Sequence, residues 1–166
     1  MRGSDVARLG AVIELLAFYH PSGLPVLLGD REPLDGVEWA DLVSGIRGRE
    51  DPYGRGPSVN LEGFLAQVAA GLEISDFIDR VCLNGWGAVV EAARAFRGTS
   101  PMDWNIWVEY IRLSDPLSSR LQDGGVTAMA DELGVDRKTI YRRRILVPMR
   151  IAREAIGGFQ RALFGG

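Results

Sequence analysis

The side chains best suited to binding chemistry are the basic residues near the carboxyl end. Between Arg137 and Arg161 the chain carries eight lysines and arginines against a single acid, Glu154. The whole protein has a formal net charge of −3, so this cluster opposes the charge of the rest. A local excess of cations on a short segment is typical of a surface that binds polyanions. We therefore expect the functional surface to lie in the last quarter of the chain.

Residues 126–147, VTAMADELGVDRKTIYRRRILV, are predicted to form two short helices joined by a tight corner. Gly134 is best suited to the left-handed conformation that such a corner needs, and Ala130 is small enough to let the second helix cross closely. Asp136 is the predicted N-cap of the second helix. Pro148 is predicted to end that helix, because proline lacks the N–H that a helix interior uses.

This pattern resembles the helix-turn-helix family of DNA-binding proteins. The residues that carry the resemblance, within ADELGVDRKTIYR, are Ala130, Gly134, Val135, Thr139 and Ile140. The sequence departs from the family at Arg143, which stands where the family usually has an aliphatic residue that packs inward. The resemblance implies that the second helix enters the major groove of duplex DNA, with its first residues nearest the base edges.

The candidate DNA contacts divide into two groups. Four side chains at the start of the second helix can enter the groove together and read bases: Arg137, Lys138, Tyr141 and Arg142. An arginine among them can bond guanine O6 and N7 in a bidentate way. Six others are expected to contact phosphates: Thr127, Thr139, Arg143, Arg144, Arg150 and Arg153. The alternative is a basic helix that is only solvated.

Apolar periodicity along the rest of the chain predicts an all-α protein, a multi-helix bundle with a C-terminal tri-helical helix-turn-helix. The predicted helices cover residues 5–19, 36–46, 61–72, 77–83, 86–96, 102–113 and 150–164, with a loop at 24–28. Trp104, Trp107, Tyr110 and Ile111 share a helical stripe and are expected in the core. We expect residues 1–100 to form an acidic helical region for oligomer or partner contacts, and residues 101–166 to form the DNA-binding region.

The composition argues against several classes of protein. A single cysteine, Cys82, and a single histidine, His20, exclude an internal disulfide and a Cys/His zinc cage. His20 is expected to be a cation at the end of the first helix. We expect no catalytic residues, no metal and no cofactor; Tyr141, the one tyrosine in an arginine cluster, lies on the proposed recognition helix itself. With no long uncharged apolar run, we expect a cytoplasmic protein without a membrane span.

The leading hypothesis is a sequence-specific transcription regulator that binds double-stranded DNA. The order of its helices resembles phage late-gene regulators, including Q-type antiterminators that act on RNA polymerase, which leaves polymerase and a second copy of the chain open as partners. The alternative is a DNA-recognising assembly component, such as a phage small terminase subunit. A third class is an enzyme that a helix-turn-helix delivers to DNA.

Overall fold

The computed structural model describes residues 3–46, 57–113 and 125–164, and side chains as far as Gly158. Within these ranges the chain forms helices and no strand, which confirms the prediction of an all-α bundle. In chain order the helices are α1 (Gly3–Tyr19), α2 (Gly23–Leu27), α3 (Gly36–Ser44), α4 (Val59–Ala69), α5 (Ile74–Val81), α6 (Trp86–Thr99), α7 (Pro101–Leu113), α8 (Gly125–Leu133) and α9 (Arg137–Phe164).

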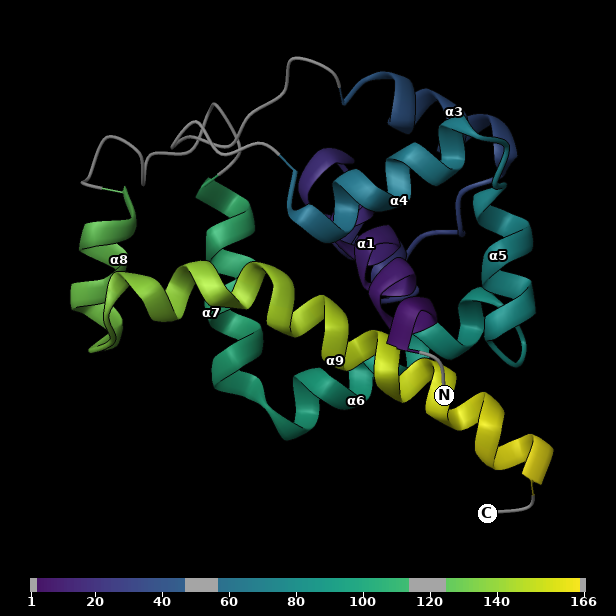
Figure 1. Ribbon diagram of the computed structural model, residues 1–166. Helices are drawn as coiled ribbons and strands as arrows, with labels where there is room; N and C mark the ends of the chain where they lie inside the picture. Colours follow the sequence, from purple (N-terminus) through teal and green to yellow (C-terminus); the bar gives the residue numbers. More distant parts are fainter. Residues whose placement is uncertain (1–2, 47–56, 114–124, 165–166) are drawn as a thin grey trace.

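Helix α1 lies at the centre of the bundle. Every residue from Leu9 to Ala17 is buried, as its apolar residues on both sides predict. Helices α9 and α4 pack along α1, and α2 folds back against its end. Figure 1 shows α9 running from α8 at one edge of the molecule, across α7 and α6, to the carboxyl end. Helices α1 and α9 thus form the frame on which the others are mounted.

The prediction that Pro148 ends a helix is wrong, because Pro148 lies inside α9, which is 28 residues long. A proline inside a helix costs about 3 kcal/mol. The face formed by Val147, Ile151 and Ala152 is fully buried on both sides of the proline. Burial of one large aliphatic side chain stabilises by about 1.5–3 kcal/mol, so continued packing offsets the lost hydrogen bond.

The predicted loop at residues 24–28 is also wrong, because most of it lies in the short helix α2. Pro25 is compatible with a first helical turn, where its missing N–H has no partner to lose. Gly23 lies so close to α1 that an added Cβ would collide with the carbonyl oxygen of Leu16. This close approach, which periodicity does not reveal, folds α2 against α1.

Two hydrophobic cores hold the bundle together. The larger core takes residues from all of α1–α7 and from α9, so packing is continuous across the expected boundary at residue 100. The smaller core joins α7, α8 and the start of α9 through Ile106, Tyr110, Met129, Ala130 and Ile140, among others. The rings of Trp104, Trp107 and Tyr110 are buried, which confirms that the aromatic stripe of α7 is core.

A buried ion pair joins α9 to α1. Glu14 is 2% exposed and Arg144 is 6% exposed, and their Oε2 and Nη2 atoms lie 4.0 Å apart. Arg144 also donates to the Tyr19 hydroxyl at 3.2 Å, and its guanidinium lies 4.9 Å from the centre of the Phe18 ring. Burial raises the pKa of Glu14, although Arg144 and the N–H of Ser58 act in the opposite direction.

His20 is not the cation that its place after α1 suggests. Its Nδ1 accepts a hydrogen bond from the Ser22 N–H at 2.9 Å, which requires a lone pair on that nitrogen. Burial, aided by the charge of Arg31, lowers the pKa of His20. The neutral ring therefore closes the turn between α1 and α2 by accepting a hydrogen bond rather than by supplying charge.

We predict that Arg144→Met destabilises the fold by about 3–5 kcal/mol near neutral pH, because it leaves the buried Glu14 charge without its cation. Loss of the cation raises the pKa of Glu14 further, so Glu14 is protonated in more of the folded protein as the pH falls toward about 5. The loss of stability therefore becomes smaller over that range. Urea denaturation at about pH 7.5 and about pH 5 measures both effects.

The double variant Glu14→Gln/Arg144→Met is the matched control. Glutamine keeps an acceptor for the Ser58 N–H and removes the buried charge, so the double variant should recover much of the lost stability. An equal deficit at the two pH values, with no recovery in the double variant, would show that the pair is not what holds α9 on α1.

Candidate nucleic-acid interface

The corner between α8 and α9 is made by backbone hydrogen bonds around Gly134. The glycine has φ of +68°, in the left-handed region. The N–H of Val135 donates to the Ala130 carbonyl at 3.1 Å, and the N–H of Gly134 donates to the Asp131 carbonyl at 3.3 Å. These two bonds form a Schellman motif, which ends a helix and turns the chain sharply. Gly134 is therefore at a corner, as predicted, and not within a helix.

Asp136 caps the start of α9. Its carboxylate accepts from the N–H of Thr139 at 2.8 Å and from the Thr139 hydroxyl at 2.9 Å. These two hydrogen bonds lower the pKa of Asp136, and the nearby charges of Arg142 and Lys138 act in the same direction. A carboxylate at this position also opposes the positive end of the α9 dipole. The cap fixes where α9 begins and hence which side chains stand at its tip.

The smaller core holds this corner against α7. Met129 of α8 and Ile140 of α9 have no exposed surface and pack against α7. The ring of Tyr141 meets that of Tyr110 edge to face, with centroids 5.8 Å apart. Figure 1 shows α8 and the tip of α9 at one edge of the molecule, with α5 on the opposite side. The smaller core therefore holds the tip of α9 against α7.

The four predicted base-reading residues lie together on the first turns of α9. Arg137, Lys138 and Arg142 are exposed, whereas Tyr141 is partly buried. Arg137 Nη2 lies 3.5 Å from the Tyr141 hydroxyl. The Tyr141 ring is thus held by Tyr110 while its hydroxyl lies beside Arg137, on the same exposed turns as Lys138 and Arg142.

The predicted phosphate contacts lie in different surroundings. Thr127 of α8, Arg150 and Arg153 are exposed. The hydroxyl of Thr139 is used in the α9 cap, where it donates to Asp136. The six predicted phosphate contacts thus do not form one continuous surface, and only three of them are exposed.

The structure corrects the expectation for Arg144, and limits that for Arg143. Arg144 faces Glu14 and Tyr19 inside the protein, so its guanidinium is not placed to meet a phosphate. Arg143 is 20% exposed and its Nε donates to Asp103 Oδ1 at 2.7 Å. Arg143 thus does point inward, like the aliphatic residue expected at its position, but it meets a carboxylate there.

One sequence signal indicates that a buried cation is needed near Glu14, the place that Arg144 takes in the structure. Glu14 is the single charge within the long apolar stretch of residues 9–19. A carboxylate in the middle of a fully buried helix requires a cation or hydrogen-bond donors. The sequence does not say which of the many arginines meets it, because that depends on how α9 crosses α1.

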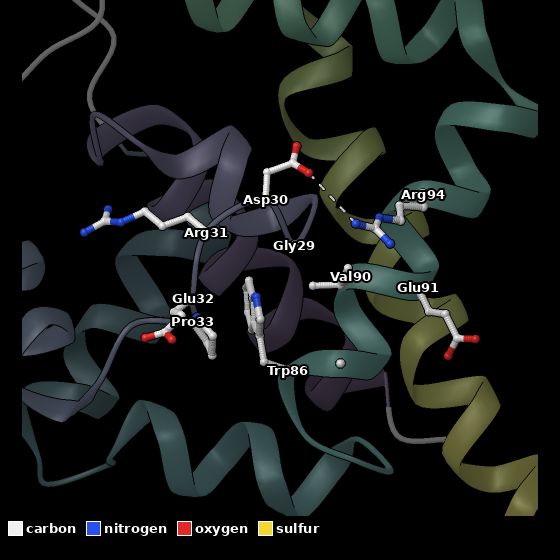
Figure 2. Close-up of a pocket in the computed structure, with 10 residues that line it drawn as sticks. Gly29, Asp30, Arg31, Glu32, Pro33, Trp86, Val90, Glu91 and Arg94 are labelled. Carbon is white, nitrogen blue, oxygen red and sulfur yellow. Dashed lines mark ion pairs between the residues drawn. The ribbon is translucent and has the colours of Figure 1, made fainter.

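A separate hollow of about 590 Å³ lies between the connector after α2 and the start of α6, with Trp86 at its centre. Two of its polar groups are engaged within the chain: the Trp86 Nε1 donates to Val26 O at 3.2 Å, and Arg94 Nε donates to Leu28 O at 2.8 Å. Figure 2 shows the charged side chains of Arg31 and Glu91 extending away from the indole. A ligand site needs polar groups that converge on the ligand. We therefore interpret these hydrogen bonds as supports of the connector after α2 and not as a ligand site.

Other kinds of site find no support in the residues that the structure describes. No group of three or more histidine, cysteine or acidic side chains is placed to hold a metal ion there. Cys82 is buried, and burial raises its pKa to about 12, so it is not a reactive thiolate at neutral pH. None of the described helices is both long and apolar enough to cross a bilayer.

We predict that Gly134→Ala destabilises the protein by about 1–2 kcal/mol, because an alanine is strained at positive φ even where space is open. Gly63→Ala in α4 is the matched control: Gly63 also has no atom near its added Cβ, but it lies within a helix. It should stabilise by about 0.5–1 kcal/mol. Equal effects of both substitutions on the free energy of unfolding would contradict the corner geometry.

Comparisons of the chain with models of protein families, with curated proteins and with solved structures found no match. A function for the corner between α8 and α9 is therefore inferred from the geometry and charge of its own residues.

Proposed function

We propose that this protein binds double-stranded DNA through the corner between α8 and α9, as a sequence-specific regulator of transcription. The observation that carries the proposal is that Arg137, Lys138 and Arg142 are exposed at the tip of α9. Asp136 caps this helix, the smaller core braces it, and the turn at Gly134 sets its direction. A solvated helix end needs no such bracing, whereas a helix that enters a groove must be held at a fixed angle.

The dimensions of the tip match the major groove. With a rise of about 1.5 Å per residue, Arg137 and Arg142 are about 7.5 Å apart along the axis of α9. The major groove of B-DNA is about 12 Å wide, so both can lie within one groove and reach base edges. Lys138 lies on the turn between them. The Tyr141 ring, held by Tyr110, fixes the depth to which the tip can enter.

Phosphate contacts come from residues outside the groove. Arg153 lies about 24 Å along α9 from Arg137, about twice the width of the groove, so we assign it to a phosphate of the flanking backbone. Thr127, near the start of α8, is exposed and accompanied by the N–H groups of that helix end, which favour an anion. These contacts set affinity and salt dependence, while the tip of α9 selects the sequence.

We predict that Arg137→Ala/Arg142→Ala loses discrimination between sites. Each bidentate arginine contributes about 1–3 kcal/mol of discrimination, so affinity for a duplex selected from a random pool should fall at least tenfold, with a smaller change on a scrambled duplex. Fluorescence anisotropy at about 50 mM and about 200 mM salt measures both. Arg153→Ala should instead weaken binding to all sequences alike and reduce the salt slope by about one.

Arg80→Gln is the control for general loss of positive charge, since Arg80 is exposed on α5, across the molecule from α8. It should leave both affinities unchanged. If the wild-type protein binds no duplex even at the lower salt concentration, or if all three variants weaken every sequence equally, the proposal fails.

A further inference from the structure

A carboxylate of the bundle reaches the basic side of α9. Asp103 lies in the first turn of α7, and its Oδ1 accepts from Arg143 Nε at 2.7 Å. Its Oδ2 lies 3.6 Å from Arg150 Nη1. Each carboxylate oxygen of Asp103 therefore faces a different arginine of the cluster.

The two arginines are placed to share one anion. Residues 143 and 150 are seven apart, which is about two helical turns, so they project from the same side of α9. Asp103 is 23% exposed and Arg150 is 49% exposed, so the group lies at the surface. Two guanidinium groups around a single carboxylate leave one positive charge in excess. A phosphodiester also carries one negative charge and accepts hydrogen bonds from arginine in the same way.

The group lies next to the proposed DNA-binding tip. Arg143 Nη1 also lies 3.5 Å from the Thr139 carbonyl, one turn back toward the start of α9. Along the axis, Arg143 and Arg150 lie about 9 Å and about 20 Å from Arg137, so the two arginines extend from the groove, which is about 12 Å wide, to the backbone that flanks it. A phosphate beside the groove would therefore approach the position that Asp103 now occupies.

We propose that Asp103 is an internal competitor of DNA phosphate, which withholds Arg143 and Arg150 from the backbone and so determines the ratio of specific to nonspecific binding. This inference rests on the proposed function. Arg143 can contact a phosphate only if its pair with Asp103 opens. The free energy gained is therefore only the difference between pairing with the phosphate and pairing with Asp103. Base contacts by Arg137 and Arg142 then dominate the affinity, which favours selective binding.

The variant Asp103→Asn tests the proposal with scrambled and selected duplexes. It keeps the side-chain shape and removes the competing charge, so two more cations should meet phosphates. The slope of log affinity against log salt should steepen by about one to two, and nonspecific affinity at low salt should rise roughly tenfold. Affinity for the selected duplex should rise less, which lowers the ratio of specific to nonspecific binding.

Glu109→Gln is the matched control, because Glu109 lies on the same helix, loses the same charge and also pairs with an arginine, Arg112, at 2.8 Å. It should leave the salt slope unchanged. The triple variant Asp103→Asn/Arg143→Gln/Arg150→Gln should lose the gain, which separates release of these two arginines from a general change in charge. Thermal unfolding of each variant verifies that it is folded.

The outcomes separate the two proposals. If the wild-type protein binds duplex DNA and folded Asp103→Asn has the same salt slope and affinities, Asp103 only joins α7 to α9 and the inference is overturned, while DNA binding stands. An equal gain in Glu109→Gln also overturns it. If neither the wild-type protein nor Asp103→Asn binds any duplex, the proposed function fails and the inference fails with it.

Discussion

The position of α9 against α1 is the constraint on which the rest of the structure depends. The pair between Arg144 and Glu14 is part of that contact, and both charges are buried. Such a pair is costly to break and fixes one register of the two helices, because a shifted α9 would leave Glu14 without its cation. The apolar residues around Pro148 then complete the contact and keep the helix continuous.

Helix α9 is continuous and contributes residues to both hydrophobic cores. Its first turns lie in the smaller core with α7 and α8, and its middle lies in the larger core with α1 and α6. The tip that carries Arg137, Lys138 and Arg142 is therefore an extension of the central frame rather than part of a tethered module. This arrangement suits a surface that must present several side chains at a fixed angle, since the backbone freedom of that segment has already been lost in folding.

The sequence predicts much of the fold because most of its signals are local. Helical periodicity gives the all-α class, the aromatic stripe of α7 predicts core residues, and Gly134 with Asp136 predicts a corner and a cap that the structure contains. Predictions are wrong where long-range packing overrides a local rule. Helix α9 continues through Pro148 because Val147, Ile151 and Ala152 on either side of it are buried, and residues 24–27 are helical because Gly23 allows a close approach to α1.

The candidate site is predictable to the same extent. Exposed cations at the tip of α9 follow from spacing, whereas the partners of Arg143 and Arg144 come from α7 and α1, which lie 40 and 130 residues away in the chain. A count of positive charges treats all these arginines alike. Their division into groups that face solvent, share a carboxylate or lie buried depends on tertiary contacts that no local pattern encodes.

The most direct test of the central claim is a map of the surface that meets duplex DNA, obtained from amide chemical shifts of labelled protein during titration with a short duplex. We expect the shifts to concentrate in residues 125–142, with smaller changes near Asp103 and Arg150, and none around Trp86. Shifts concentrated around Trp86 and α3, or an unchanged spectrum at saturating duplex, would contradict the account.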